Sequence, residues 1–155
     1  MTREPLSVIS KYWDRKPVPI EEIITDLGLE LVKESLDNEV SGYIERKPDG
    51  RYRIVVNGNH PRTRQRFTAA HELGHYIYHR DLLGDGVGDN RAYRAEGTRR
   101  PNPYIRPQHE RQANSFAANV LMPRHALINV GNRNTEELAK EFGVSTEAMR
   151  IRLGR

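Results

Sequence analysis

The chain has 155 residues, a length typical of one domain, and it contains no cysteine, which excludes disulfides and thiolate metal sites. Charged residues make up 30% of the chain and the net charge is +4, so a polar surface is expected and any bound transition metal must use histidine and carboxylate ligands. The N-terminus lacks the apolar segment of a signal peptide and no run approaches a membrane span, which predicts a cytoplasmic protein without a membrane partner.

The first third of the chain predicts short helices followed by strands. Helices are expected over residues 6–13 and 19–27, and strands over residues 29–32, 42–45 and 51–57. Gly28 is placed to end the second helix, and Pro48-Asp49-Gly50 is typical of a turn. The strand over residues 51–57 has the clearest pattern of the three.

The next segment contains His71-Glu72-Leu73-Gly74-His75, an HExxH motif. On an α-helix His71 and His75 are one turn apart, so both imidazoles can bind one Zn²⁺. Glu72 lies about 100° around the helix, where its carboxylate can accept a proton from a zinc-bound water. An apolar stripe of helical period supports a helix packed into a core; its members are Phe67, Ala70, Leu73, Gly74 and Ile77. Incidental histidines on a solvated helix are the alternative interpretation.

Residues 82–106 are rich in Gly, Asp, Arg and Pro, with little periodicity. A loop of about 25 residues in a compact domain is usually a lid, a binding loop or disorder. Among its arginines, Arg94, Arg99 and Arg100 are candidates for contact with a substrate. A solvated basic face is the alternative.

Residues 107–123 predict a second long helix bounded by proline at both ends. Its expected buried face consists of Ala113, Phe116, Ala117, Val120 and Leu121, and Glu110 lies three residues before that face begins. A carboxylate on the buried side of a helix is costly unless it is paired or bound to a metal. Asp81 stands where an extended motif would have a third histidine, so Glu110 is the candidate for the third zinc ligand.

The remaining polar candidates are less sharply defined. His109, Tyr104 and Tyr78 could each stabilise the oxyanion of a tetrahedral intermediate, and the sequence does not rank them. His79 is one turn beyond the motif and is expected to be hydrogen-bonded or solvated. His60 is expected at the surface.

The C-terminal segment, residues 134–155, resembles a helix-turn-helix hairpin. Gly143 makes the turn and Ser145 can cap the second helix. The predicted core of this hairpin consists of Leu138, Ala139, Phe142, Val144, Met149 and Leu153. A DNA reader would present residues such as Glu147 to the major groove, and an acidic residue is poorly suited there. We therefore expect the hairpin to pack on the core, with DNA contact as the alternative.

Residues 66–75, 110–118 and 121–123 together resemble the ImmA/IrrE family of zinc metallopeptidases, and the segments around residues 18–29 and 52–57 fit as well. The sequence predicts one α+β domain over residues 1–155, with N-terminal helices over 1–28 and the hairpin over 134–155. The resemblance, which runs from about residue 15 to the C-terminus, implies a zincin-like core with a short mixed or antiparallel sheet over 29–123. It implies His71, His75 and Glu110 as Zn²⁺ ligands and Glu72 as the base.

The resemblance also implies a partner and a place for it. Members of the family typically cleave, or act upon, a helix-turn-helix repressor of a mobile element or stress regulon. In zincin-like folds the strand before the metal helix forms the edge of the cleft, so Ile54, Val55 and Val56 are expected to pair with an extended substrate. The alternative function is a regulator or toxin–antitoxin component that binds a repressor or DNA without cleaving it.

Overall fold

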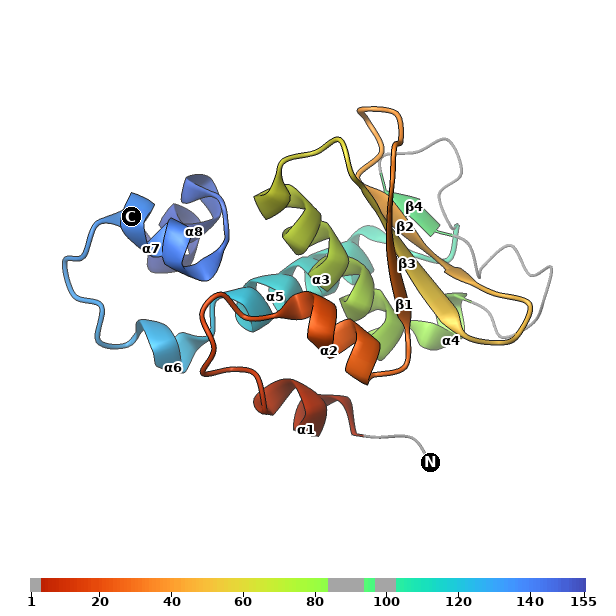
Figure 1. The fold of residues 1–155 in the computed structure, drawn as a ribbon, viewed down its shortest axis with the longest axis horizontal. Coiled ribbons are helices and arrows are strands. Elements are labelled where there is room, and N and C mark those ends of the chain that lie inside the picture. The colour runs from red at the N-terminus through yellow and green to blue at the C-terminus, as the bar shows by residue number, and fades with distance from the viewer. Residues whose placement is uncertain (1–3, 84–93, 97–102) are drawn as a thin grey trace.

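The computed structural model describes residues 4–83, 94–96 and 103–155, and it consists of a mixed sheet covered by helices (Figure 1). The sheet has the order β1-β3-β2-β4, with β1 at Glu30–Glu34, β2 at Gly42–Arg46, β3 at Tyr52–Asn57 and β4 at Arg94–Glu96. β1 runs parallel to β3, and β2 runs antiparallel to both β3 and β4. The α+β class and the short mixed sheet are confirmed.

β3 is an inner strand of this sheet. Ile54 is in register with Leu31 of β1 on one side and with Ile44 of β2 on the other. Because both sides of the β3 main chain are paired within the sheet, β3 offers no edge to an extended substrate. The expectation that Ile54, Val55 and Val56 bind substrate through their main chain is therefore wrong, and these side chains are buried instead.

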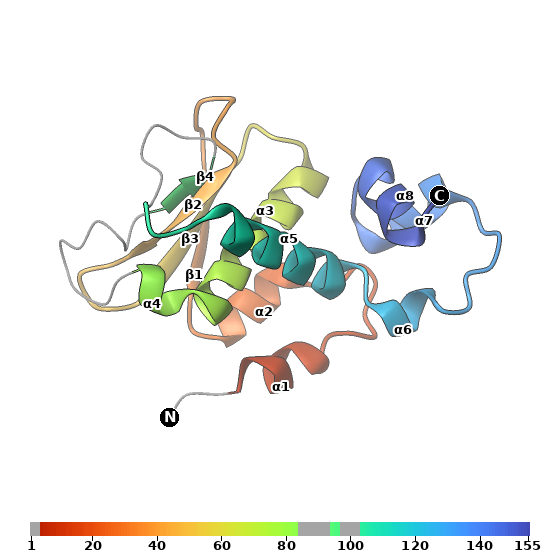
Figure 2. The ribbon, with the colours of Figure 1, turned by 180° about the vertical axis from the view of Figure 1, so that it is seen from behind.

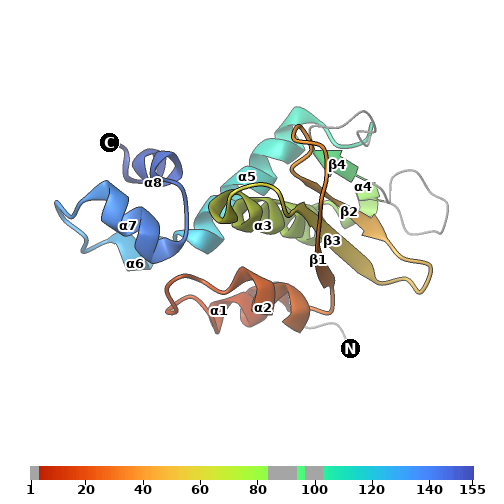
Figure 3. The same cartoon turned by 45° about the horizontal axis from the view of Figure 1, so that its top comes forward.

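Two N-terminal helices lie at one end of β1, below the long helix that contains the HExxH motif (Figure 3). They are α1 at Pro5–Ser10 and α2 at Ile20–Asp26. Three isoleucines of α2, at positions 20, 23 and 24, are fully buried, which is the spacing of one helix face. Gly28 follows α2 with a φ of 92°, a conformation that glycine adopts without strain, and it directs the chain into β1.

The centre of the molecule is the pair of long helices α3 (Arg62–Tyr78) and α5 (Pro107–Leu121), which lie side by side (Figures 1 and 2). A Cβ on Gly74 of α3 would lie 3.0 Å from Cδ2 of Phe116 and 3.3 Å from Cα of Ala113. The helices approach this closely because Gly74 has no side chain. Two short helices follow the long ones, α4 at Arg80–Leu83 and α6 at Arg124–Leu127.

The C-terminal hairpin forms as predicted, from α7 (Thr135–Phe142) and α8 (Thr146–Leu153). Gly143 makes the turn with a φ of 67°, and the Ser145 hydroxyl accepts a hydrogen bond from the backbone N–H of Ala148 at 3.0 Å. Five of the six predicted core residues are buried, and Leu153 is half-buried. The hairpin lies at the end of the molecule away from the sheet (Figure 1).

Arg66 joins the hairpin to the core. Its guanidinium donates to the carbonyls of Gly143 at 2.9 Å, Val18 at 2.9 Å and Phe142 at 3.3 Å. Burial lowers the pKa of this group. Two of the three carbonyls belong to the C-terminal end of α7, where the helix dipole stabilises a cation.

The arginines at the end of the chain also bind carbonyl groups of the same chain. Nε of Arg152 donates to the carbonyl of Met122 at 3.1 Å, and Arg155 donates to the carbonyls of Arg133 at 2.7 Å and Gly131 at 2.6 Å. These contacts favour a hairpin packed on the core over one that presents its arginines to phosphates. Among the described residues, no helix is long and apolar enough to cross a bilayer.

Candidate metal centre

Three side chains of the HExxH motif meet inside the molecule. His71, Glu72 and His75 have exposed fractions of 1%, 0% and 0%. One ligand atom from each lies within 4.8 Å of those from the other two. The arrangement follows from the helical period, because the two histidines are one turn apart on α3 and Glu72 is their immediate neighbour.

Glu110 of α5 brings a carboxylate to the same point. Its Oε1 lies 2.6 Å from Nε2 of His75 and 3.2 Å from Nε2 of His71, and the two Nε2 atoms are 3.1 Å apart. In a tetrahedral zinc site with bonds of about 2.0 to 2.2 Å, ligand atoms lie about 3.3 Å apart. Two neutral imidazoles and one carboxylate are also the donor set of many catalytic zinc sites, so these residues fit the metal.

Glu110 is more open than a residue on the buried face. Its side chain is 35% exposed, whereas the histidines that it contacts are buried. The residue lies in the first turn of α5, ahead of the buried positions that begin at Ala113. Glu110 is thus the most solvent-exposed of the three proposed ligands in the described part of the chain.

In each motif histidine, Nε2 lies beside Glu110 and Nδ1 is hydrogen-bonded to another side chain. Nδ1–H of His71 donates to the side-chain carbonyl of Asn114 at 2.7 Å. Nδ1 of His75 lies 2.9 Å from Nδ1 of His79, whose Nε2–H donates to the side-chain carbonyl of Gln112 at 2.7 Å. His79 is only 3% exposed, and burial lowers its pKa. Of the two roles expected for His79, hydrogen-bonded or solvated, the structure has the hydrogen-bonded one.

Asn114 and Gln112 were not singled out from the sequence, although one signal was present. Asn114 lies one helical turn after Glu110, so a helix that presents Glu110 to α3 also presents Asn114. Gln112 has no such indication, because it reaches the centre only through His79. His60 was placed wrongly: it is 5% exposed, and its Nε2 contacts the carbonyl of Asn38 at 2.9 Å.

The three oxyanion candidates lie in different surroundings. Nδ1 of His109 accepts a hydrogen bond from the backbone N–H of Arg106 at the start of α5, and its ring is 4.8 Å from that of His79. Tyr104 is 51% exposed just before the helix. The ring of Tyr78 packs 5.7 Å from that of Phe116, in a groove lined by residues of α1, which does not support a role for Tyr78 at the metal centre.

Of the three basic substrate-contact candidates, Arg94 lies in a described strand. Arg94 begins β4, which pairs with β2. Arg99 and Arg100 lie outside the described residues. Figures 2 and 3 place β4 beside the beginning of α5, the segment that carries Glu110.

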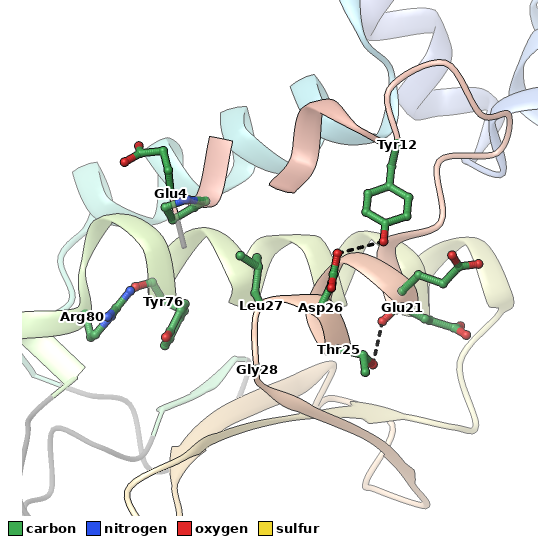
Figure 4. A pocket seen from close by; sticks show the side chains of 11 residues that line it. Glu4, Tyr12, Glu21, Thr25, Asp26, Leu27, Gly28, Tyr76 and Arg80 are labelled. Atoms are coloured by element: carbon green, nitrogen blue, oxygen red, sulfur yellow. Dashed lines mark hydrogen bonds between the residues drawn. The ribbon is translucent and has the colours of Figure 1, made fainter. Parts of the chain in front are cut away.

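A groove of about 1080 Å³ lies elsewhere, between the N-terminal helices and the end of α3 (Figure 4). It is lined by acidic and aromatic residues, among them Asp26, which accepts a hydrogen bond from the hydroxyl of Tyr12 at 3.0 Å. Tyr76 and Arg80 line its other side. It includes none of the residues of the metal centre and is not the candidate active site.

Comparisons with known proteins bear on the fold and the family of this chain. No curated protein matches the chain. A solved structure described as a Mycobacterium tuberculosis transcriptional regulator has a similar fold, with a TM-score of 0.60 and 18% identity over 97% of this chain and 46% of that chain. This chain thus spans about half the length of that regulator, and at this identity the likeness concerns the fold alone. The family described as the IrrE N-terminal-like domain matches residues 24–154. The chain therefore belongs to the ImmA/IrrE family of metal-dependent peptidases.

Proposed function

We propose that this chain is a zinc-dependent endopeptidase that cleaves a specific cytoplasmic protein, with His71, His75 and Glu110 holding the metal and Glu72 acting as the base. The observation that carries the proposal is the convergence of three donor atoms, 2.6 to 3.2 Å apart, beside the buried carboxylate of Glu72. Glu72 is not needed to complete the set of three protein ligands, so its place in the centre is explained by catalysis.

When bound, Zn²⁺ supplies Lewis acidity that polarises a peptide carbonyl and lowers the pKa of a water molecule towards about 7. Glu72 accepts a proton from the attacking water and later delivers it to the nitrogen of the leaving amine. The Glu72 carboxylate is buried, and one of its oxygens lies within 4.8 Å of a ring nitrogen of each motif histidine. His109 and Tyr104 remain the candidates for binding the developing oxyanion.

The substrate that we propose is a helix-turn-helix repressor. The family resemblance supports this choice, and the regulator with a similar fold is described as acting in transcription. Among the described strands, β4 is one of the two outer strands of the sheet, with one side paired to β2, and we propose that an extended segment pairs with its other side and not with β3. Arg94, Arg99 and Arg100 remain the candidate substrate contacts from the sequence, and arginines in that role would favour acidic residues in the substrate.

Glu72→Gln tests the proposal most directly. Gln keeps the size of the side chain but does not accept the proton, so this variant should retain zinc and fold while cleavage of the repressor falls by a factor of about 10² to 10⁴. His71→Ala should lose the metal itself. Zinc content after reconstitution and cleavage of a repressor encoded nearby, followed by mass spectrometry, are the measurements. A wild-type protein that takes up no zinc would refute the proposal.

The same experiment separates cleavage from binding. In a regulator that only binds its partner, Glu72→Gln would leave derepression in cells unchanged, because the fold and the metal are both kept. Derepression that disappears with Glu72→Gln supports the peptidase.

A further inference from the structure

The two proposed histidine ligands, His71 and His75, have different hydrogen-bond partners at Nδ1. His71 donates directly to an amide carbonyl, whereas Nδ1 of His75 faces Nδ1 of a second histidine, His79, at 2.9 Å. A hydrogen bond between two ring nitrogens requires one to carry a proton and the other to accept it. The direction of this bond decides whether Nε2 of His75 has a lone pair for the metal.

The side chain of Gln112 determines which of the two histidines donates the hydrogen bond between their Nδ1 atoms. Its side-chain carbonyl is only an acceptor, so Nε2 of His79 must carry the proton in the bond of 2.7 Å between them. The neutral ring of His79 then has a bare Nδ1, which accepts the proton of Nδ1 of His75. With its proton on Nδ1, His75 presents an unprotonated Nε2 beside Glu110.

We propose that Gln112 and His79 form a relay that holds His75 in the tautomer and orientation needed to bind zinc. His79 is a positioning residue in this scheme, and Gln112 acts through it from α5. The relay thus adds a further connection between α5 and the centre, besides Glu110 and the bond of Asn114 to His71. This inference rests on the proposed zinc site.

The test compares two substitutions of His79. In His79→Asn the side-chain oxygen takes the place of Nδ1 and still accepts from His75, while His79→Leu offers no acceptor. We expect His79→Leu to weaken zinc binding by about 10- to 100-fold and His79→Asn to stay close to wild type. Zinc affinity is measured by competition with a chelator, and the unfolding midpoint of each metal-free protein shows whether the variant folds.

A substitution of Gln112 tests the relay independently. Gln112→Leu should weaken zinc binding in the wild-type protein, and it should have no effect in the His79→Asn protein, where the acceptor no longer depends on the tautomer of His79. Equal losses in both backgrounds would mean that Gln112 acts on the packing of α5, and would overturn the relay.

Nuclear magnetic resonance of the zinc-loaded wild type reads the tautomers directly. Two-bond ¹H–¹⁵N spectra should show the proton of His79 on Nε2 and that of His75 on Nδ1; a proton on Nδ1 of His79 would refute the relay. The His71→Ala protein is the control for loss of the site. If the wild type itself binds no zinc, the proposed function fails, whereas zinc affinity that is equal in wild type and His79→Leu refutes the relay alone.

Discussion

At the scale of single residues, Asn114 holds the ring of His71 in place without reaching the metal position. Its carbonyl accepts from Nδ1 of His71 at 2.7 Å, so Nε2 is left unprotonated and points towards Glu110. Such bonds raise the basicity of a ligand and hold its ring in place before the metal arrives. A residue of this kind affects metal affinity more than it affects folding.

Asn114→Leu should therefore weaken zinc binding by about 10- to 100-fold, with a small change in the stability of the metal-free protein. Chelator competition gives the affinity, and urea unfolding gives the stability. Asn119→Leu is a matched control, because Asn119 is an exposed asparagine of the same helix that lines the groove facing α1. If both variants lose the same affinity, the bond to His71 is not the cause.

At the scale of elements, the contact between α3 and α5 brings Glu110 to the two histidines. Gly74 lies at this contact, and the atoms that its added Cβ would meet include the main chain of Ala113 at 3.3 Å. A main-chain atom cannot turn aside as a flexible side chain does, so α5 would have to shift. Glu110 lies three residues before Ala113 on the same helix and would move with it.

For Gly74→Ala we expect a net loss of about 1 kcal/mol in the free energy of unfolding, since overpacking costs about 1 to 3 kcal/mol and the helix propensity of Ala returns up to about 1. Zinc affinity should fall as well. Gly58→Ala is the control, because its Cβ would meet no described atom nearer than 3.6 Å. A Gly74→Ala protein that is more stable than wild type and binds zinc equally well would show that α5 is free to adjust.

At the scale of the whole molecule, Arg66 connects three parts of the chain that are distant in sequence. Arg66→Ala leaves the buried carbonyls of Val18, Phe142 and Gly143 without their donor, so a loss of roughly 3 kcal/mol is expected. Hydrogen exchange should rise most in α7 and α8. Arg64→Ala, which removes an exposed side chain, should change little. Uniform acceleration across the sheet and the hairpin alike would contradict a local role.

Glu141 makes a second connection to the hairpin, and this one depends on pH. Its carboxylate binds Arg133 at 2.6 Å and Lys16 at 3.3 Å, and its pKa is lowered, chiefly by the hydrogen bond from Arg133. The folded-state pKa thus lies below the unfolded value of about 4.3, so the stabilisation is complete well above that pH and is lost as the pH falls through the folded-state value.

Glu141→Gln should accordingly lower the free energy of unfolding by about 0.5 kcal/mol near pH 7, a value limited by solvent screening of half-exposed groups. The difference should vanish as the pH falls through the lowered folded-state pKa of Glu141, so that in acid the two proteins are equally stable. Urea unfolding at several pH values checks both statements. A difference that stays constant down to acid pH would mean that the introduced glutamine disturbs packing and not charge. The exposed pair of Glu147 and Arg150 offers a comparison in the same hairpin.

Features that depend on residues close together in the sequence were predicted correctly, whereas features that depend on distant segments were not. His71 and His75 are one helical turn apart, so their meeting was predictable from local periodicity, as were the turn at Gly143 and the cap at Ser145. The inner position of β3 was not, because its parallel partner β1 lies more than twenty residues earlier and no local pattern encodes that pairing. Likewise, the relay through Gln112 depends on how two helices are placed against each other.

The separation of the proposed ligands along the chain couples the metal to folding. Glu110 follows His75 by 35 residues, and the three donors meet only when α5 has docked on α3. An unfolded chain can offer zinc only the neighbouring histidines, so the ion binds the native state far more tightly and raises its thermal midpoint with the logarithm of free zinc. Removal of the metal would thus act on folding as well as on catalysis, and the lifetime of the peptidase in a cell would depend on the supply of zinc.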